Sequence, residues 1–292
     1  MKDWLLPLLR IPLSDTPLTL SSDGKHLVGD GISFHIDGDI PSFLERHTAE
    51  NGFDYTAHYT ADAEVFDYFE EESDPLSALG SRLLRHTTMR QVPDSARLLL
   101  DVGCGSAFVA QHFCPRGRRV VSMDIAQANV RKALQLYPSD NHAAVVADAY
   151  RLPFADNTFD CIIASEIIEH TVDPQGFLAA LIAKVKPGGL LLVSTPYRER
   201  IAYSLCIHCN CKTPHNAHLH SFDEAKFERL AAPLPADITG MRLVDNKLIL
   251  RSHLAVPLSR LGMPLWSACD RLANRLTRKA SHFIIALRKK TP

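Results

Sequence analysis

Between residues 97 and 195 the chain alternates short, almost wholly apolar runs with longer segments in which apolar residues recur every three or four positions. The first kind of segment is typical of strands buried on both faces, and the second of helices. The pattern predicts strands at 97–102, 119–124, 143–147, 159–165 and 190–195, and helices at 107–113, 126–137 and 174–185. This alternation predicts an α/β fold, in which helices cover both faces of a parallel sheet.

The pattern continues less regularly toward the C-terminal end. A lysine-, proline- and glycine-containing stretch at 186–189 predicts a turn before the strand at 190–195. Beyond that strand we expect four further elements, namely a helix at 222–232, a strand at 242–250, a long helix at 258–279 and a last strand at 282–287.

The first 95 residues have a different character. Short β segments at 18–20, 26–28 and 32–36 are separated by turn residues, which predicts a small β module in residues 1–46. Helical spacing at 61–72 and 76–89 predicts a helical cap or linker in residues 47–95. Residues 96–292 are then expected to form the main domain.

Composition narrows the class of protein. The chain has 292 residues, 46% of them hydrophobic, and a formal net charge of −1. No overall charge favours nucleic acid, although this does not exclude it as a partner. No apolar stretch approaches the roughly 20 residues that span a bilayer. Seven cysteines, an odd number, do not read as a disulfide framework, which predicts a reduced, cytoplasmic setting. The oligomeric state stays open.

Asp101, Gly103 and Gly105 stand where the first predicted strand of the sheet meets a helix. Glycine permits a tight turn and a close approach of the backbone to a ligand, and the start of a helix offers free N–H groups. Ligands of open parallel sheets bind at the carboxyl ends of the strands. The segment alone is also compatible with a plain strand-to-helix turn, since the third glycine of a dinucleotide fingerprint is absent.

Acidic residues also mark the ends of the next two strands. Asp124 stands about 20 residues after the glycines, where a carboxylate can accept hydrogen bonds from both hydroxyls of a ribose, and Asp148 follows the strand at 143–147. The strand at 159–165 leads into the sequence Ser-Glu-Ile-Ile-Glu-His at 165–170. In this combination residues 96–200 resemble the class I S-adenosylmethionine-dependent methyltransferases, especially the branch that contains the ubiquinone and menaquinone biosynthesis enzymes.

The resemblance implies a Rossmann-like seven-stranded sheet of order 3-2-1-4-5-7-6, with the last strand antiparallel. It implies S-adenosylmethionine as cofactor, with its methionine part beside the glycines, its ribose on Asp124 and its adenine facing Asp148 and Ala149. Ser165 is expected near the reactive sulfonium. The predicted cofactor site comprises Asp101, Gly103, Cys104, Gly105, Asp124, Ile125, Asp148, Ala149 and Ser165.

Methyl transfer needs mainly alignment of the acceptor with an already activated donor, and a general base helps where the acceptor loses a proton. His170 follows the fourth predicted strand and is a candidate base, although a histidine that caps or packs a helix is an equally good interpretation. Tyr197 follows the fifth strand and is a candidate for lining the acceptor pocket.

The N-terminal module shows a second resemblance. Its stretch 37–44 (Asp-Gly-Asp-Ile-Pro-Ser-Phe-Leu) is similar to the small zinc-ribbon-like domain that activates certain tRNA and protein methyltransferases. The metal-binding forms carry Cys-Pro-x-Cys where this chain has Ile11, Pro12 and Ser14, so zinc is not expected there. The module is expected to dock or stabilise the main domain.

Three cysteines at 206, 209 and 211 are followed by histidines at 215, 218 and 220. Cys-x2-Cys is a usual half of a zinc site, which downstream histidines can complete. The predicted ligands are Cys206, Cys209, His218 and His220, with Cys211 and His215 as alternatives. A structural zinc and a loop without metal both remain open, and a catalytic zinc that activates a thiol acceptor is a third interpretation.

Taken together, the residues predict methyl transfer from S-adenosylmethionine to a small-molecule or metabolic-intermediate acceptor. An RNA or protein methyltransferase is the alternative that the N-terminal module suggests. A regulatory protein that binds the cofactor without catalysis is a further alternative. A nicotinamide-dependent dehydrogenase would leave Asp148 and the segment 165–170 unexplained.

Overall fold

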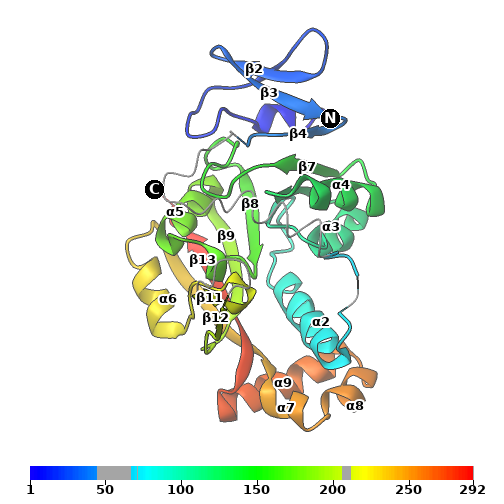
Figure 1. The fold of residues 1–292 in the computed structure, drawn as a ribbon, viewed down its shortest axis with the longest axis vertical. Coiled ribbons are helices and arrows are strands. Elements are labelled where there is room, and N and C mark those ends of the chain that lie inside the picture. The colour runs from blue at the N-terminus through cyan, green and yellow to red at the C-terminus, as the bar shows by residue number, and fades with distance from the viewer. Residues whose placement is uncertain (45–66, 71, 206–211, 292) are drawn as a thin grey trace.

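A seven-stranded sheet forms the centre of the molecule (Figure 1). The computed structural model describes residues 1–44, 67–70, 72–205 and 212–291. The order of the strands across the sheet is β7-β6-β5-β8-β9-β13-β12, which is the predicted order 3-2-1-4-5-7-6. The strands are β5 (Leu98–Val102), β6 (Arg119–Asp124), β7 (His142–Val146), β8 (Phe159–Ser165), β9 (Val185–Pro196), β12 (Ala236–Asn246) and β13 (Ala280–Lys289). Five strands pair in parallel, and β13 runs antiparallel to both β9 and β12, so the predicted fold is confirmed.

Different helices cover the two faces of the sheet, because successive side chains of a strand point to opposite faces. In β5, Leu100 packs in one cluster with Phe177 of α5 and Phe227 of α6, whereas Leu99 packs in another with Phe108 of α3. The helices are α3 (Phe108–Phe113), α4 (Gln127–Leu136), α5 (Pro174–Lys184) and α6 (Glu224–Ala231). Asp173 begins α5 by accepting hydrogen bonds from the backbone N–H groups of Gln175 and Gly176.

The N-terminal module is a four-stranded antiparallel sheet that lies against the β7 edge of the main sheet (Figure 1). It contains η1 (Leu6–Leu8), β1 (Thr19–Leu20), β2 (His26–Gly29), β3 (Ile32–Asp37) and β4 (Ile40–Pro41), of which β4 was not predicted. The Phe43 N–H donates to the Val146 carbonyl at 2.8 Å, and Leu9 and Phe34 share a hydrophobic cluster with Phe154 of the main domain. The module thus covers a strand edge that would otherwise be open.

The C-terminal segment differs from its prediction in three places. The strand expected at 242–250 is wrong in both bounds, since β12 ends at Asn246 and is followed by α7 (Lys247–Arg251). The Asn246 side chain accepts from the Leu248 N–H and so begins a helix where the apolar run predicted a strand. The long helix at 258–279 is two helices, α8 (Ala255–Arg260) and α9 (Met263–Thr277), separated at Gly262 by a φ of +91°.

Two further predictions also change. The stretch 186–189, expected as a turn, belongs to β9, which begins at Val185. The helix expected at 76–89 is confirmed as α2 (Pro75–Met89), whose first turn is capped by the Asp74 carboxylate at 2.8 Å from the Ser77 N. The helix expected at 61–72 falls largely outside the described residues, and its described residues, 67–70 and 72, are not helical. Within the described residues no helix is long and apolar enough to cross a membrane.

Asp270 of α9 holds the end of β12 through its buried carboxylate, which accepts the N–H of Asn246 at 2.7 Å and that of Asp245 at 3.2 Å. Burial raises the pKa of Asp270 from 3.8 to about 6. The folded chain therefore holds this proton more tightly than the unfolded chain, and it loses stability as the pH rises from about 4 through 6.

We expect Asp270→Asn to remove this loss. The full pKa difference corresponds to about 3 kcal/mol, of which about 2 kcal/mol is lost between pH 4.5 and pH 7.5. Urea unfolding of the wild type should therefore give a free energy lower by about 2 kcal/mol at pH 7.5 than at pH 4.5 from this group. The variant should show that much less dependence on pH. If the wild type and the variant change in parallel between the two pH values, the assignment to Asp270 is wrong.

Candidate functional site

The loop that joins β5 to α3 turns on two glycines with left-handed backbone conformation. Gly103 has a φ of +62° and Gly105 a φ of +44°. A Cβ atom on Gly103 would lie 2.2 Å from Cδ1 of Ile167, in the loop that follows β8. The loops after β5 and β8 therefore approach each other so closely that only glycine fits at position 103 without a shift of Ile167.

Asp124 ends β6 and reaches back to this loop. Its Oδ1 accepts the Ala126 N–H at 2.9 Å, and its Oδ2 accepts the Gly105 N–H at 3.2 Å. The carboxyl is buried, and burial raises its pKa although these backbone hydrogen bonds act in the opposite direction. The Cys104 thiol lies 4.0 Å from the same oxygen, and burial raises its pKa well above the ordinary value, so it is a neutral packing group here.

Asp101 is the second buried carboxyl of the site, with only 1% of its surface exposed. Its Oδ2 has no hydrogen-bond partner among the described residues. Burial and the neighbouring Asp124 raise its pKa well above the ordinary value. An orphaned buried carboxyl beside a glycine loop fits a ligand that brings a hydrogen-bond donor or a positive charge to this position.

The other predicted cofactor residues lie at the same edge of the sheet. Ile125 follows β6, and Asp148 and Ala149 follow β7, where Asp148 Oδ1 accepts the Tyr150 N–H at 2.9 Å. Ser165 ends β8, with its hydroxyl 2.7 Å from that of Ser194 on β9. The predicted set thus gathers at the carboxyl ends of adjacent parallel strands, where ligands of such sheets bind.

A group of histidines and carboxylates lies beside this edge. Glu169, His170 and His218 place one donor atom each within 4.8 Å of one another. Glu169 and His170 belong to η3 (Ile168–His170), and His218 follows η4 (His215–Ala217). The His170 and His218 rings are 4.8 Å apart, and His218 Nδ1 lies 2.5 Å from a Glu199 oxygen.

Glu169 is fully buried in this group. Its Oε2 accepts from the Thr195 hydroxyl at 3.0 Å, while Oε1 has no hydrogen-bond partner in the described part of the chain. Burial, followed by repulsion from Glu166, raises its pKa well above the ordinary value. These donor types could hold a divalent cation, for which nitrogen and oxygen ligands suffice.

The predicted zinc ligands are only partly covered by the structure. Cys206 and Cys209, and the alternative Cys211, lie outside the described residues, between β10 (Tyr203–Leu205) and β11 (Lys212–Pro214). His218 joins Glu169 and His170, whereas His220 is not part of that group, and its Nε2 is buried without a hydrogen-bond partner in the described part. Glu169 was missed, although it directly precedes the predicted His170.

Tyr197 lies apart from the histidine group. Only 2% of the residue is exposed, its ring packs on Phe283, and its hydroxyl donates to Glu224 at 3.0 Å. These contacts are those of a core tyrosine whose structural role is to connect the end of β9 with α6. Its predicted role in lining an acceptor pocket stays a prediction.

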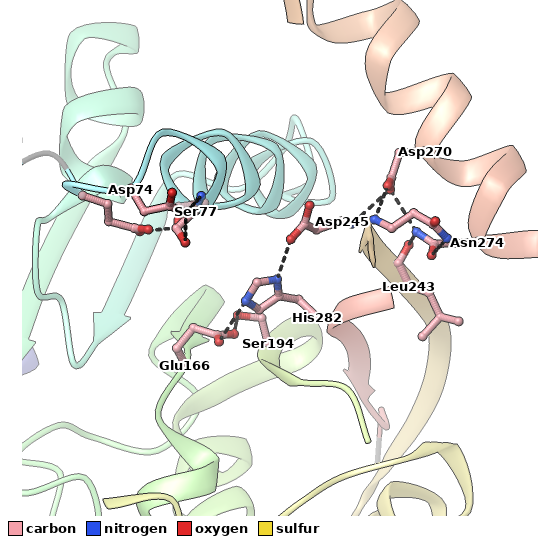
Figure 2. A network of polar contacts seen from close by, with 12 residues as sticks. Asp74, Ser77, Glu166, Ser194, Leu243, Asp245, Asp270, Asn274 and His282 are labelled. Carbon is pink, nitrogen blue, oxygen red and sulfur yellow. Dashed lines mark hydrogen bonds and ion pairs between the residues drawn. The ribbon is translucent and has the colours of Figure 1, made fainter. Parts of the chain in front are cut away.

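Sequence reasoning also missed a polar network across β8, β9, β12 and β13, in which His282 lies between Glu166 and Asp245 (Figure 2). The Ser194 hydroxyl donates to Glu166 Oε1 at 2.9 Å. His282 carries no local motif, and only the pairing of β13 with β9 and β12 brings it to this place.

Residues 100–193 match the family model described as a methyltransferase domain. A ubiquinone biosynthesis O-methyltransferase of Rickettsia akari (strain Hartford) is 32% identical over 111 residues, which are 37% of this chain and 44% of that protein. The chain spans about half the length of the curated relatives it matches. The stretch 100–193 that the family model matches contains the glycine loop, Asp124, Asp148 and the segment 165–170.

Solved structures share the fold at low identity. The [4+2]-cyclase SpnF matches with a TM-score of 0.55 and 19% identity, over 77% of this chain and 87% of that one. The 1,6-didemethyltoxoflavin-N1-methyltransferase of Burkholderia thailandensis matches with a TM-score of 0.52 and 13% identity, over 95% of this chain and all of that one. Since a cyclase and a methyltransferase share this fold, the fold alone does not decide the reaction. Residues 100–193 are thus similar in sequence to a methyltransferase domain, and the chain as a whole has a fold that solved methyltransferases share.

Proposed function

We propose that this protein transfers a methyl group from S-adenosylmethionine to an oxygen of a small-molecule acceptor. The observation that carries the proposal is the pair of buried carboxyls, Asp101 and Asp124, on either side of the glycine loop at the carboxyl ends of β5 and β6. The preference for oxygen rests on the relatives of this chain, which are ubiquinone biosynthesis O-methyltransferases.

The residues at this edge fit the cofactor in kind and position. Asp124 would exchange its contact with the Gly105 N–H for the ribose hydroxyls, and Asp101 would gain the partner that its Oδ2 lacks. Asp148 and Ala149 after β7 would border the adenine, and Ser165 the methyl-donating end. S-adenosylmethionine supplies a methyl group on a sulfonium, so the protein has mainly to hold the acceptor in line with it.

The experiment is a mass-spectrometric assay of S-adenosylhomocysteine with S-adenosylmethionine and two panels of acceptors. One panel holds hydroxylated aromatic compounds such as catechol and 3,4-dihydroxybenzoate, and the other holds primary amines of similar size. Product formed only with the hydroxyl panel is the expected result. Product formed only with amines overturns the oxygen assignment, and no product with either panel overturns the proposed activity. Transfer RNA as a third acceptor tests the alternative of an RNA methyltransferase.

We further propose that the group Glu169, His170 and His218 holds one divalent cation. The support is the closeness of the three donor atoms and the unpartnered, buried Oε1 of Glu169. Of the predicted zinc ligands, His218 lies in this group, while Cys206 and Cys209 fall outside the described residues. A reduced, cytoplasmic setting and a small-molecule rather than a nucleic-acid acceptor belong to the proposed methyl transfer, and the transfer-RNA assay tests the choice of acceptor.

Elemental analysis of the purified protein is expected to show about one zinc per chain, and His218→Ala should lower that content several-fold. Treatment with a strong chelator should remove the metal and lower the melting temperature, because a bound ion stabilises the folded state that holds it. His26→Ala, in the N-terminal module, is the control and should retain the metal. Metal-free protein, or equal metal content in His218→Ala and His26→Ala, contradicts the site.

A further inference from the structure

His282 of β13 stands between two carboxylates that belong to distant parts of the chain (Figure 2). Its Nε2 is 3.6 Å from Glu166 Oε2, and its Nδ1 is 3.7 Å from Asp245 Oδ2. Nδ1 is buried and makes no hydrogen bond within the described residues. Both separations are ion-pair distances that exceed a hydrogen bond, and such contacts in ligand-free sites commonly shorten when substrate binds.

The backbone is strained at both carboxylates. Glu166 has a φ of +58° and Asp245 a φ of +65°, a left-handed conformation that residues other than glycine rarely adopt. Such backbone strain persists only where surrounding contacts impose it, and strained residues are more frequent at functional sites. Each of these two residues directs its carboxylate toward His282, Glu166 from the loop after β8 and Asp245 from β12 (Figure 2).

Surrounding contacts hold this arrangement in place. The Asp245 N–H donates to Asp270 of α9 at 3.2 Å, which fixes the strained end of β12. On the other side, Gly80 of α2 leaves room for the Asp245 carboxylate, because a Cβ there would lie 2.7 Å from Asp245 Oδ2. Asp245 is only 4% exposed, whereas Glu166 and His282 have side chains that are 32% and 23% exposed. The network therefore leads from a buried carboxylate to one that a ligand can reach.

Glu166 is the accessible end, and it lies beside the predicted methyl-donating position. It directly follows Ser165 at the end of β8 and directly precedes Ile167, which contacts the Gly103 turn. The Ser194 hydroxyl holds its Oε1 at 2.9 Å, so Oε2 remains for His282 and for an acceptor. A carboxylate accepts a proton from a substrate hydroxyl when it is positioned within hydrogen-bond reach.

We propose that Glu166 is the proton acceptor of the methyl-transfer step, and that His282 and Asp245 are positioning residues that aim its carboxylate; this rests on the proposed function above. As the acceptor oxygen forms its bond to the methyl carbon, the bond from that carbon to the donor sulfur breaks. The hydroxyl proton passes to Glu166. The products are a methyl ether, the neutral thioether S-adenosylhomocysteine and protonated Glu166, so charge and atoms balance.

Several charged groups lie near Glu166, His282 and Asp245, and their charges contribute to the pH dependence of the proposed proton transfer. Glu169 lies near Glu166 from the loop after β8, as the rise in the pKa of Glu169 reflects. On the side of Asp245, Lys247 of α7 attracts and Glu72, before α2, repels the carboxylate charge, while burial raises the Asp245 pKa. Asp270 stands behind them on α9. The rival proton acceptor is His170, which belongs to the histidine group with His218.

The test compares Glu166→Gln, Glu166→Asp, His282→Gln, Asp245→Asn and His170→Gln with the wild type, with His26→Gln as a matched control. His26 is likewise a histidine within 3.9 Å of a carboxylate, Asp23, but it lies in the N-terminal module. The assay measures kcat, KM and the profile of kcat against pH with the hydroxyl acceptor that the wild type turns over. Calorimetry measures the affinity for S-adenosylmethionine, and circular dichroism reports folding.

Glu166→Gln is expected to lower kcat by about 10²- to 10⁴-fold and to remove the acidic limb of the pH profile, with the affinity for S-adenosylmethionine within about threefold of the wild type. Glu166→Asp should recover part of kcat. His282→Gln and Asp245→Asn should lower kcat by smaller factors and change the pH profile, with KM nearly unchanged, while His26→Gln changes neither.

Three results overturn the proposal. They are a normal kcat in folded Glu166→Gln, an acidic limb that disappears in His170→Gln instead, and an unchanged pH profile in both His282→Gln and Asp245→Asn. If the wild-type protein methylates no acceptor, both the proposed function and this inference are contradicted. If the wild type is active and Glu166→Gln is equally active, only this inference is contradicted.

Discussion

Asp124→Ala is expected to weaken the binding of S-adenosylmethionine by about 1–3 kcal/mol, which is the cost of removing a buried, charge-assisted hydrogen-bond partner. The carboxylate ends β6 and already accepts the Gly105 N–H at 3.2 Å. It therefore lies directly beside the glycine loop, where the ribose of the cofactor is expected. Isothermal titration calorimetry of the variant and the wild type measures the difference directly.

Asp140→Ala serves as the control for this prediction. Asp140 is an exposed aspartate that pairs with Lys2 and lies just before β7, away from the carboxyl ends of the strands. Its removal should leave the affinity for S-adenosylmethionine unchanged. Equal affinities for the wild type and Asp124→Ala would remove the ribose assignment. A loss of the same size in both variants would point to a general effect on the fold.

Gly103→Ala is expected to lower the free energy of unfolding by about 2–4 kcal/mol and to abolish measurable binding of the cofactor. The φ of +62° disfavours any side chain, and the added Cβ would meet Ile167 Cδ1 at 2.2 Å. Ile167 must therefore turn away, which disturbs the loop that carries Glu166. Urea unfolding and calorimetry together separate the loss of stability from the loss of binding.

Gly38→Ala isolates the contribution of the contact. Gly38 has nearly the same φ, +61°, but a Cβ there would have nothing within 4 Å. The control should therefore show only the cost of the backbone conformation, about 1–2 kcal/mol, and should bind cofactor normally. If both variants lose the same stability and both bind the cofactor, the close approach of the two loops has no role in the site.

Local chemistry explains why much of the candidate site could be predicted from the sequence. Asp101, Gly103 and Gly105 lie within five consecutive residues. Asp124 ends one strand and Asp148 closely follows another, and the apolar runs of both strands are plain in the sequence. Parallel pairing then brings the strand ends to one edge, so the position of each carboxylate follows from the order of the strands.

The remaining features depend on contacts that no local pattern carries. His282 meets Glu166 and Asp245 only because β13 inserts between β9 and β12. The apolar run Leu248 to Leu250 is compatible with a strand or a helix. The Asn246 side chain, which accepts the Leu248 N–H and caps α7, favours the helix. His218 meets Glu169 and His170 through a segment that returns to the sheet from β11 and η4.

The central claim is that the edge formed by the carboxyl ends of β5 to β8 binds S-adenosylmethionine. Calorimetric titration of the purified protein with S-adenosylmethionine and, separately, with S-adenosylhomocysteine tests it most directly. Saturable binding of both ligands, near one per chain, is the predicted result. A well-folded sample that binds neither ligand would contradict the account.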